Sequence, residues 1–207
     1  MSDIDIRNLN ARAVRASMDI VRQAAPADLN RATPCAGWTL ADLLGHMTVQ
    51  HAGFAAAARG DGADLAHWKF APAGPDAVER YLEASEEVLA AFAAVESMDA
   101  SFVLPEFAVD PPIFPAAQAI SFHFIDYVVH AWDVARALGV PFTLEEELQQ
   151  PALDVALLVP GGNARLRDGA AFAPVLDGSA GSDSGSAVPV LDQILRHLGR
   201  SPGWPKS

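Results

Sequence analysis

The segment SFHFIDYVVHAWDVARALG (residues 121–139) restricts the possible folds of this chain more than any other stretch. It is mostly apolar, yet it holds His123, Asp126 and His130 at spacings of three and four residues. At about 100° per residue, these three side chains lie within about 60° of one another around a helix. The pattern predicts a long helix over residues 114–138 whose buried side carries ionisable groups.

Three other stretches show the 3.6-residue period of amphipathic helices. They are residues 5–25, 40–60 and 75–97. Thr39 followed by Asp42 forms a capping-box pattern that predicts where the second of these helices begins. Gly139 predicts the end of the helix at 114–138, because glycine readily adopts the left-handed conformation after a last helical turn. Four long amphipathic helices predict an all-α four-helix bundle.

The remainder of the chain is less regular. A fifth helix is expected after a cap at Thr143, and residues 159–207 are rich in Gly, Ser and Pro, with a short helix at 189–199. This stretch could hold one or two short strands, or it could lie over the bundle without regular secondary structure. We predict a helical bundle at 1–158 and a short irregular C-terminal extension at 159–207 that packs on it.

Composition excludes several classes of protein. The formal net charge is -12, from 26 acidic against 14 basic residues, so the chain would repel nucleic acid and anionic membrane surfaces. A single cysteine allows no intramolecular disulfide. The N-terminal stretch lacks the apolar core of a secretory signal, and no window of about 20 residues is apolar enough to span a bilayer. These features predict a cytoplasmic protein.

The ionisable residues on the apolar faces indicate a metal site. Asp126 and His130 are about 6 Å apart along the helix axis, a spacing that suits two ligands of one ion, whereas His123 lies about 10.5 Å from His130. His46 falls on the apolar side of the second helix, at i+3 from Leu43. Taken singly, His46 and His130 are more often satisfied core histidines than ligands.

Taken together, the three residues favour a ligand set. A buried carboxylate is costly unless it is compensated, and no Arg or Lys lies at i±3 or i±4 from Asp126. Either a histidine or a cation must neutralise it. A divalent ion held by His46, Asp126 and His130 would do so, and three protein ligands leave positions open for chemistry. Zn is the first choice of metal, with Ni or Fe as alternatives.

Two motifs carry a resemblance to a known family. The stretches TPCAGWTLADLLGHM (33–47) and DYVVHAWDVARALG (126–139) resemble the DinB-like metal-binding bundle proteins, and in particular the branch related to mycothiol-dependent maleylpyruvate isomerase. The tail at 176–204 also looks like the C-terminal signature of that branch. The resemblance implies a four-helix bundle in which His46 and His130 bind a divalent metal. The remaining ligand is glutamate in the isomerase itself, whereas this chain has Asp126, one methylene shorter.

The resemblance also implies a chemistry. Members of this superfamily look like transferases and isomerases in which the metal binds a small thiol, mycothiol in this branch, and lowers its pKa. The thiolate then attacks a small electrophilic substrate. Three hypotheses follow: such an enzyme, a non-catalytic metal- or small-molecule-binding bundle, or an interaction module with a structural metal clasp. An apolar face of the bundle could also support a homodimer.

Four other residues remain open between two interpretations. Cys35 is a small buried loop residue or a thiolate stabilised at a helix N-terminus. Trp38 either packs into the end of the bundle and closes it, or stacks on a substrate. Asp133, at i+3 from His130, orients the imidazole as a hydrogen-bond acceptor or bonds to a loop backbone. His123 is a core or surface histidine, or it lies beside the ligands or the substrate.

Overall fold

The computed structural model describes residues 5–107, 110, 112–166, 172–176 and 188–205. The chain divides into two units, Met1–Pro141 and Phe142–Ser207. Each unit is described by itself.

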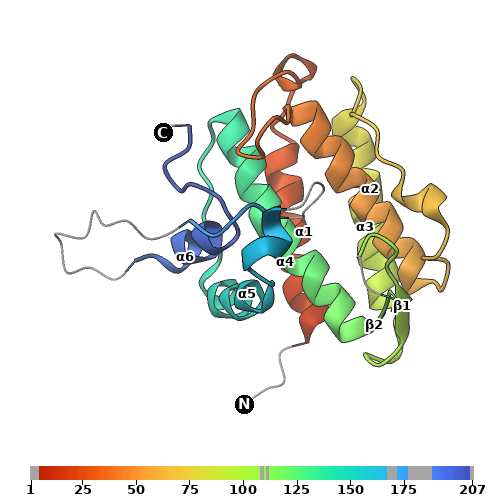
Figure 1. Ribbon diagram of the computed structural model, residues 1–207. Coiled ribbons are helices and arrows are strands. Elements are labelled where there is room, and N and C mark those ends of the chain that lie inside the picture. Colours follow the sequence, from red (N-terminus) through yellow and green to blue (C-terminus); the bar gives the residue numbers. More distant parts are fainter. Residues whose placement is uncertain (1–4, 108–109, 111, 167–171, 177–187, 206–207) are drawn as a thin grey trace. The chain divides into compact units, whose positions relative to one another are not determined.

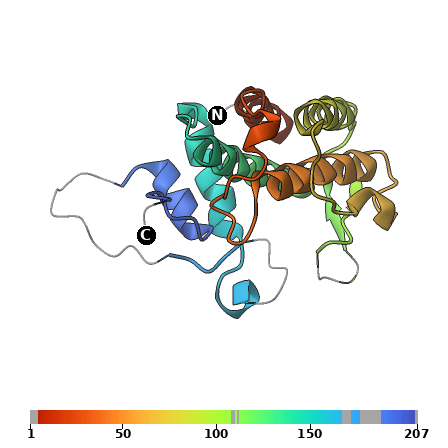
Figure 2. The same cartoon turned by 90° about the horizontal axis from the view of Figure 1, so that it is seen from above.

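Four long helices make up the first unit (Figure 1), and this all-α bundle confirms the predicted fold class. They are α1 (Ile6–Val21), α2 (Leu40–Ala58), α3 (Ala77–Ala93) and α4 (Ala116–Leu138). The closest partners are α1 with α4 and α2 with α3, and further contacts join α1 to α3 and α2 to α4. Figure 2 shows the four helices from above. The arrangement makes α2 and α4, the helices with the predicted ligands, neighbours.

Two of the predicted helix ends are confirmed. The Thr39 side chain accepts a hydrogen bond from the Asp42 backbone N–H, and the Asp42 carboxylate accepts one from the Thr39 N–H at 2.9 Å, which completes the capping box. Gly139 ends α4 with φ 74°, a left-handed conformation that costs glycine little because it lacks a Cβ.

Short elements in the connections escaped the sequence analysis. Strands β1 (Ser101–Val103) and β2 (Ile113–Pro115) pair antiparallel, with Phe102 opposite Phe114. Two short 3-10 helices lie elsewhere, η1 (Pro26–Asp28) and η2 (Leu65–Trp68). Segments of three or four residues are too short to show a hydrophobic period, so only pairing and packing reveal them.

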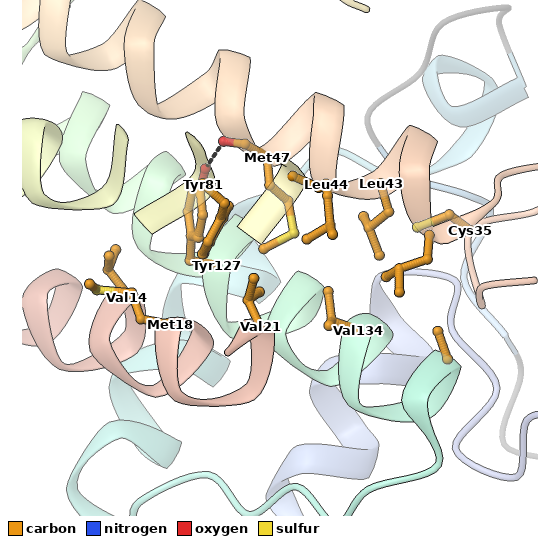
Figure 3. Packing of buried hydrophobic residues seen from close by; sticks show 13 residues of the cluster. Val14, Met18, Val21, Cys35, Leu43, Leu44, Met47, Tyr81, Tyr127 and Val134 are labelled. Carbon is orange, nitrogen blue, oxygen red and sulfur yellow. Dashed lines mark hydrogen bonds between the residues drawn. The ribbon is translucent and has the colours of Figure 1, made fainter. Parts of the chain in front are cut away.

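The hydrophobic core of this unit forms two clusters along the bundle. Figure 3 shows the first, in which Leu43, Leu44 and Met47 of α2 pack near Val134 of α4. The second cluster gathers around Phe54, Phe92 and Phe102. Burying a Leu or Met side chain contributes about 1.5–3 kcal/mol relative to leaving it exposed.

A polar layer lies between the two clusters. It contains Asn10 of α1, His51 of α2, Ser85 of α3 and His123 of α4, all buried. Asn10 Oδ1 accepts a hydrogen bond from His123 Nδ1 at 2.7 Å, the two imidazoles join at 3.1 Å between His51 Nδ1 and His123 Nε2, and Ser85 Oγ lies 3.0 Å from His51 Nε2. One residue from each helix therefore specifies how the four pack together.

The second unit contains α5 (Glu146–Leu158), η3 (Gly162–Leu166) and α6 (Val190–His197), and α5 packs against α6. The predicted cap at Thr143 is wrong, because α5 has Glu145 at its N-cap, without a side-chain capping bond. Arg165 organises the irregular part by donating hydrogen bonds to the carbonyls of Pro160, at 2.7 Å, and Val159, at 3.1 Å.

The predicted division of the chain at 158/159 stays a prediction, as does the packing of the extension on the bundle. No strand occurs in the parts of 159–207 that the structure describes, and residues 177–187 of the tail motif lie outside them. Among the helices that the structure describes, none has the length and apolarity that a membrane span requires.

Candidate metal centre

Three side chains from α2 and α4 meet where the sequence predicts a metal site. His46 of α2 and Asp126 and His130 of α4 each offer a ligand atom, and these atoms all lie within 4.8 Å of one another. His130 Nε2 is 3.3 Å from Asp126 Oδ1. The rings of His46 and His130 lie nearly perpendicular, with centroids 5.2 Å apart.

These distances suit a single ion. Ligand atoms held about 2.1 Å from a metal at tetrahedral angles lie about 3.4 Å from each other. The pair from α4 already has this separation, and the third ligand atom lies within 4.8 Å of both. Two imidazoles and one carboxylate are a donor set that Zn, Ni and Fe accept.

The tautomer of His130 is set by its other ring nitrogen. His130 Nδ1 lies 2.9 Å from Asp133 Oδ2 and donates its proton to this carboxylate. Asp133 is fully buried and also accepts a hydrogen bond from Cys35 Sγ at 3.2 Å. With the proton on Nδ1, the lone pair of Nε2 is left for a cation, which is the usual arrangement of a metal-ligating histidine.

The local charges also favour a cation. Burial by itself would raise the pKa of Asp126, but the neighbouring imidazoles, His130 foremost, outweigh burial and lower it to about 2. Burial would lower the pKa of His130, but Asp126 and Asp133 outweigh that effect and raise it well above its usual value. The two carboxylates therefore hold a positive charge at this imidazole, as a proton or as a metal ion.

A second group of ligand-type residues shares His130. Cys35, His130 and Asp133 also offer atoms within 4.8 Å of one another, and all three are buried. Their polar atoms, however, already engage one another through the Asp133 carboxylate. Since His46 and Asp126 are only partly buried, the first group combines ligands with access from solvent. Cys35 and Asp133 therefore hold the His130 imidazole in place from the side of Nδ1.

Aromatic side chains border the first group. Trp38 makes an edge contact with His46, with ring centroids 5.1 Å apart, and stacks on Phe70 at 6.2 Å. Gly45 lets the Phe70 segment approach α2, because a Cβ at this position would lie 2.2 Å from the carbonyl oxygen of Ala71. The glycine of the LLGHM motif thus has a steric role beside His46, the candidate ligand.

His46, Asp126 and His130 are called the metal group from here on. His123 is not part of it. Both of its ring nitrogens are engaged, by His51 and Asn10, and the residue is buried in the core. Its partner His51 was not predicted, although His51 lies at i+4 from Met47 and i+7 from Leu44, on the apolar side of α2. That spacing could have indicated a buried polar pair.

Comparison with known proteins identifies the family of the bundle. Residues 11–135 match the family model of the mycothiol maleylpyruvate isomerase N-terminal domain. The matched range includes every residue of the metal group.

Similar proteins include the uncharacterized proteins MT0763 and Rv0738, from two strains of Mycobacterium tuberculosis. Each is 31% identical over 138 residues, which cover 64% of this chain and 67% of the relative. Among solved structures, a mutant of the mycothiol-dependent maleylpyruvate isomerase matches with a TM-score of 0.56 and 12% identity, over 73% of this chain and 66% of that one. This likeness concerns the fold, and the chain spans slightly less than two thirds of the solved chain.

Proposed function

We propose a function for this chain from one premise, that it belongs to the mycothiol maleylpyruvate isomerase N-terminal domain family. In this proposal it is an enzyme that depends on a divalent metal and on a low-molecular-weight thiol of the mycothiol type. It catalyses either transfer of the thiol to a small electrophilic substrate or isomerisation of that substrate. The observation that carries the proposal is the convergence of His46, Asp126 and His130 with ligand atoms within 4.8 Å.

Each residue of the centre has a distinct part in this proposal. A divalent ion, when bound, lowers the pKa of a thiol so that the thiolate forms near neutral pH. His46, Asp126 and His130 hold the ion, and Asp133 keeps the Nδ1 proton of His130 in place. Trp38 and Phe70 form an aromatic edge beside His46 that excludes water from one side of the site.

Metal analysis tests the first part of the proposal. The purified chain should contain close to one equivalent of Zn, Ni or Fe, and His46→Ala should lose most of it, because two ligands bind far more weakly than three. His67→Ala is the matched control, since His67 of η2 is partly exposed and pairs with Asp61, away from the metal group. Equal metal content in both variants would contradict the assignment of His46.

Thiol-dependent turnover tests the second part. The metal-loaded protein should convert maleylpyruvate or an electrophilic dye with added mycothiol, and not without thiol. A panel of other thiols then defines the co-substrate.

A non-catalytic metal- or small-molecule-binding bundle is the second candidate. It is favoured by Asp126, which is one methylene shorter than the glutamate that the resemblance implies for the isomerase. Full metal content with no turnover would support this alternative. A cytoplasmic location and a homodimer stay predictions.

A further inference from the structure

Glu106 and its neighbour Phe107 connect the loop between β1 and β2 to α2 and α4, the two helices that carry the metal group. Gln50 of α2 donates a hydrogen bond from Nε2 to Glu106 Oε2 at 2.6 Å. The next residue, Phe107, stacks on Phe122 of α4 with ring centroids 4.9 Å apart. The position of Glu106 is therefore defined from two sides.

These two anchors lie at the same end of the metal group. α2 and α4 run antiparallel, since His46 contacts His130 while His51, further along α2, contacts His123, earlier on α4. Gln50 follows His46 by one turn, and Phe122 precedes Asp126 by one turn. Glu106 therefore borders the metal group at the Asp126 end.

The surroundings of Glu106 suit proton transfer. The residue is exposed to solvent. Burial of one side of its carboxyl group and the charge of Asp126 raise its pKa, against the opposing effect of the Gln50 hydrogen bond. Within the part of the chain that the structure describes, neither Lys nor Arg forms an ion pair with it. A base with increased proton affinity and access to solvent is the type that general acid–base catalysis uses.

Other ionisable groups near the centre are already engaged. Asp133 is buried and accepts hydrogen bonds from His130 and Cys35. His123 uses both ring nitrogens in the polar layer. Glu106 borders the metal group and is exposed to solvent, so a bound thiol or substrate could reach its carboxylate.

We propose that Glu106 is the proton acceptor and donor of the reaction, an inference that rests on the proposed function. The S–H bond of the thiol breaks as its proton moves to the Glu106 carboxylate and a new O–H bond forms. The sulfur lone pair forms the S–C bond, and the electron pair displaced from the electrophile moves to a neighbouring carbon or to the leaving group. The carbon or leaving group that receives this electron pair then takes the proton from Glu106. Charge and atoms balance without an oxidant or reductant.

Glu106→Gln tests the proposal, because it keeps the hydrogen-bonding shape and removes the base. We expect thiol-dependent kcat to fall by about 100-fold or more, the usual share of general acid–base catalysis. Metal content should not change. The acid limb of the pH–rate profile should disappear, and Glu106→Asp should restore part of the rate. Glu86→Gln, an exposed carboxylate on α3, is the matched control and should behave as the unmodified protein.

Three results would overturn the inference. They are a kcat for Glu106→Gln within about threefold of the control, an unchanged acid limb, or a loss of bound metal that accounts for the lost rate. Failure of the proposed function gives a different result, namely a metal-loaded unmodified protein without thiol-dependent turnover. If the unmodified protein turns over and Glu106→Gln does so equally well, only the role of Glu106 is rejected.

Discussion

Asp133 illustrates how one buried carboxylate controls a neighbouring residue. It has no exposed surface and accepts hydrogen bonds from His130 Nδ1 and Cys35 Sγ. From the sequence, Asp133 could bond either to His130 or to a loop backbone. Geometry selects the imidazole, because the i+3 spacing on α4 places the carboxylate 2.9 Å from the ring.

At the residue scale, we predict that Asp133→Asn weakens metal binding about 10–100-fold, as removal of such supporting carboxylates usually does. The amide presents a donor as readily as an acceptor, so the proton on Nδ1 is no longer enforced. Competition titration with a chromophoric chelator measures the affinity. Asp99→Asn, at an exposed position before β1, serves as control, and equal affinities for the two variants would refute the role of Asp133.

At the scale of the elements, the contact between α2 and the segment after η2 depends on Gly45. The Ala73 N–H donates to the carbonyl of Ala41 at 2.9 Å, which holds this segment against α2. A methyl group at position 45 would collide with backbone atoms, which cannot rotate away as a flexible side chain can.

We therefore predict that Gly45→Ala lowers the free energy of unfolding by about 1–3 kcal/mol, the usual cost of overpacking, despite the better helix propensity of alanine. Urea denaturation measures the change. Gly161→Ala is the matched control, since a Cβ there meets no atom within 4 Å, and its effect should stay within about 0.5 kcal/mol. An increased free energy of unfolding for Gly45→Ala would show that the segment after η2 can move away from α2 at little cost.

At the scale of the whole bundle, the polar layer links stability to pH. Burial lowers the pKa of His51 well below its usual value, and lowers that of His123 to about 3. The groups around the two histidines are Asn10, Ser85, Tyr81, Tyr127 and Asp126. Asp126 is the one carboxylate of this set, and its attraction for a proton does not offset the effect of burial on the pKa of His123. Both imidazoles are therefore neutral in the folded protein at neutral pH.

The sign of the effect follows from proton uptake. Below about pH 6.5 the unfolded chain protonates both histidines, while the folded chain does not until the pH is far lower. Stability should therefore be constant with respect to these groups above about pH 6.5 and fall as the pH decreases, by up to about 1.4 kcal/mol per pH unit for each histidine. In the metal-free protein, His130, whose folded pKa is raised, adds little slope well below pH 6.5, because both states then carry its proton.

Urea denaturation at a series of pH values between 7 and 5 tests this prediction. The slope should decrease in the double variant His51→Gln/His123→Gln and persist in His67→Gln, which changes a partly exposed histidine. The slope, rather than the absolute stability, is the measured quantity, because the double variant also loses packing. An unchanged slope in the double variant would contradict the prediction.

Much of the bundle could be predicted from local patterns. The period of apolar residues located α1 to α4, and Thr39, Asp42 and Gly139 located two of their ends, since capping and left-handed conformations depend on residues close in sequence. Local patterns failed at Thr143, where the chain begins α5 three residues later without a side-chain cap, and at the short strands, which exist only through their pairing.

The sequence by itself determined that the chain forms a helical bundle with His46, Asp126 and His130 on apolar faces, because helical period and hydrophobicity are local properties. The tertiary structure decided what each ionisable group contacts. It paired His130 with Asp133, joined His123 to His51 and Asn10, and placed Glu106 beside Gln50. His130 and Asp133 lie on the same helix, but the other contacts join residues from different elements, and only the packing of those elements sets the distances between them.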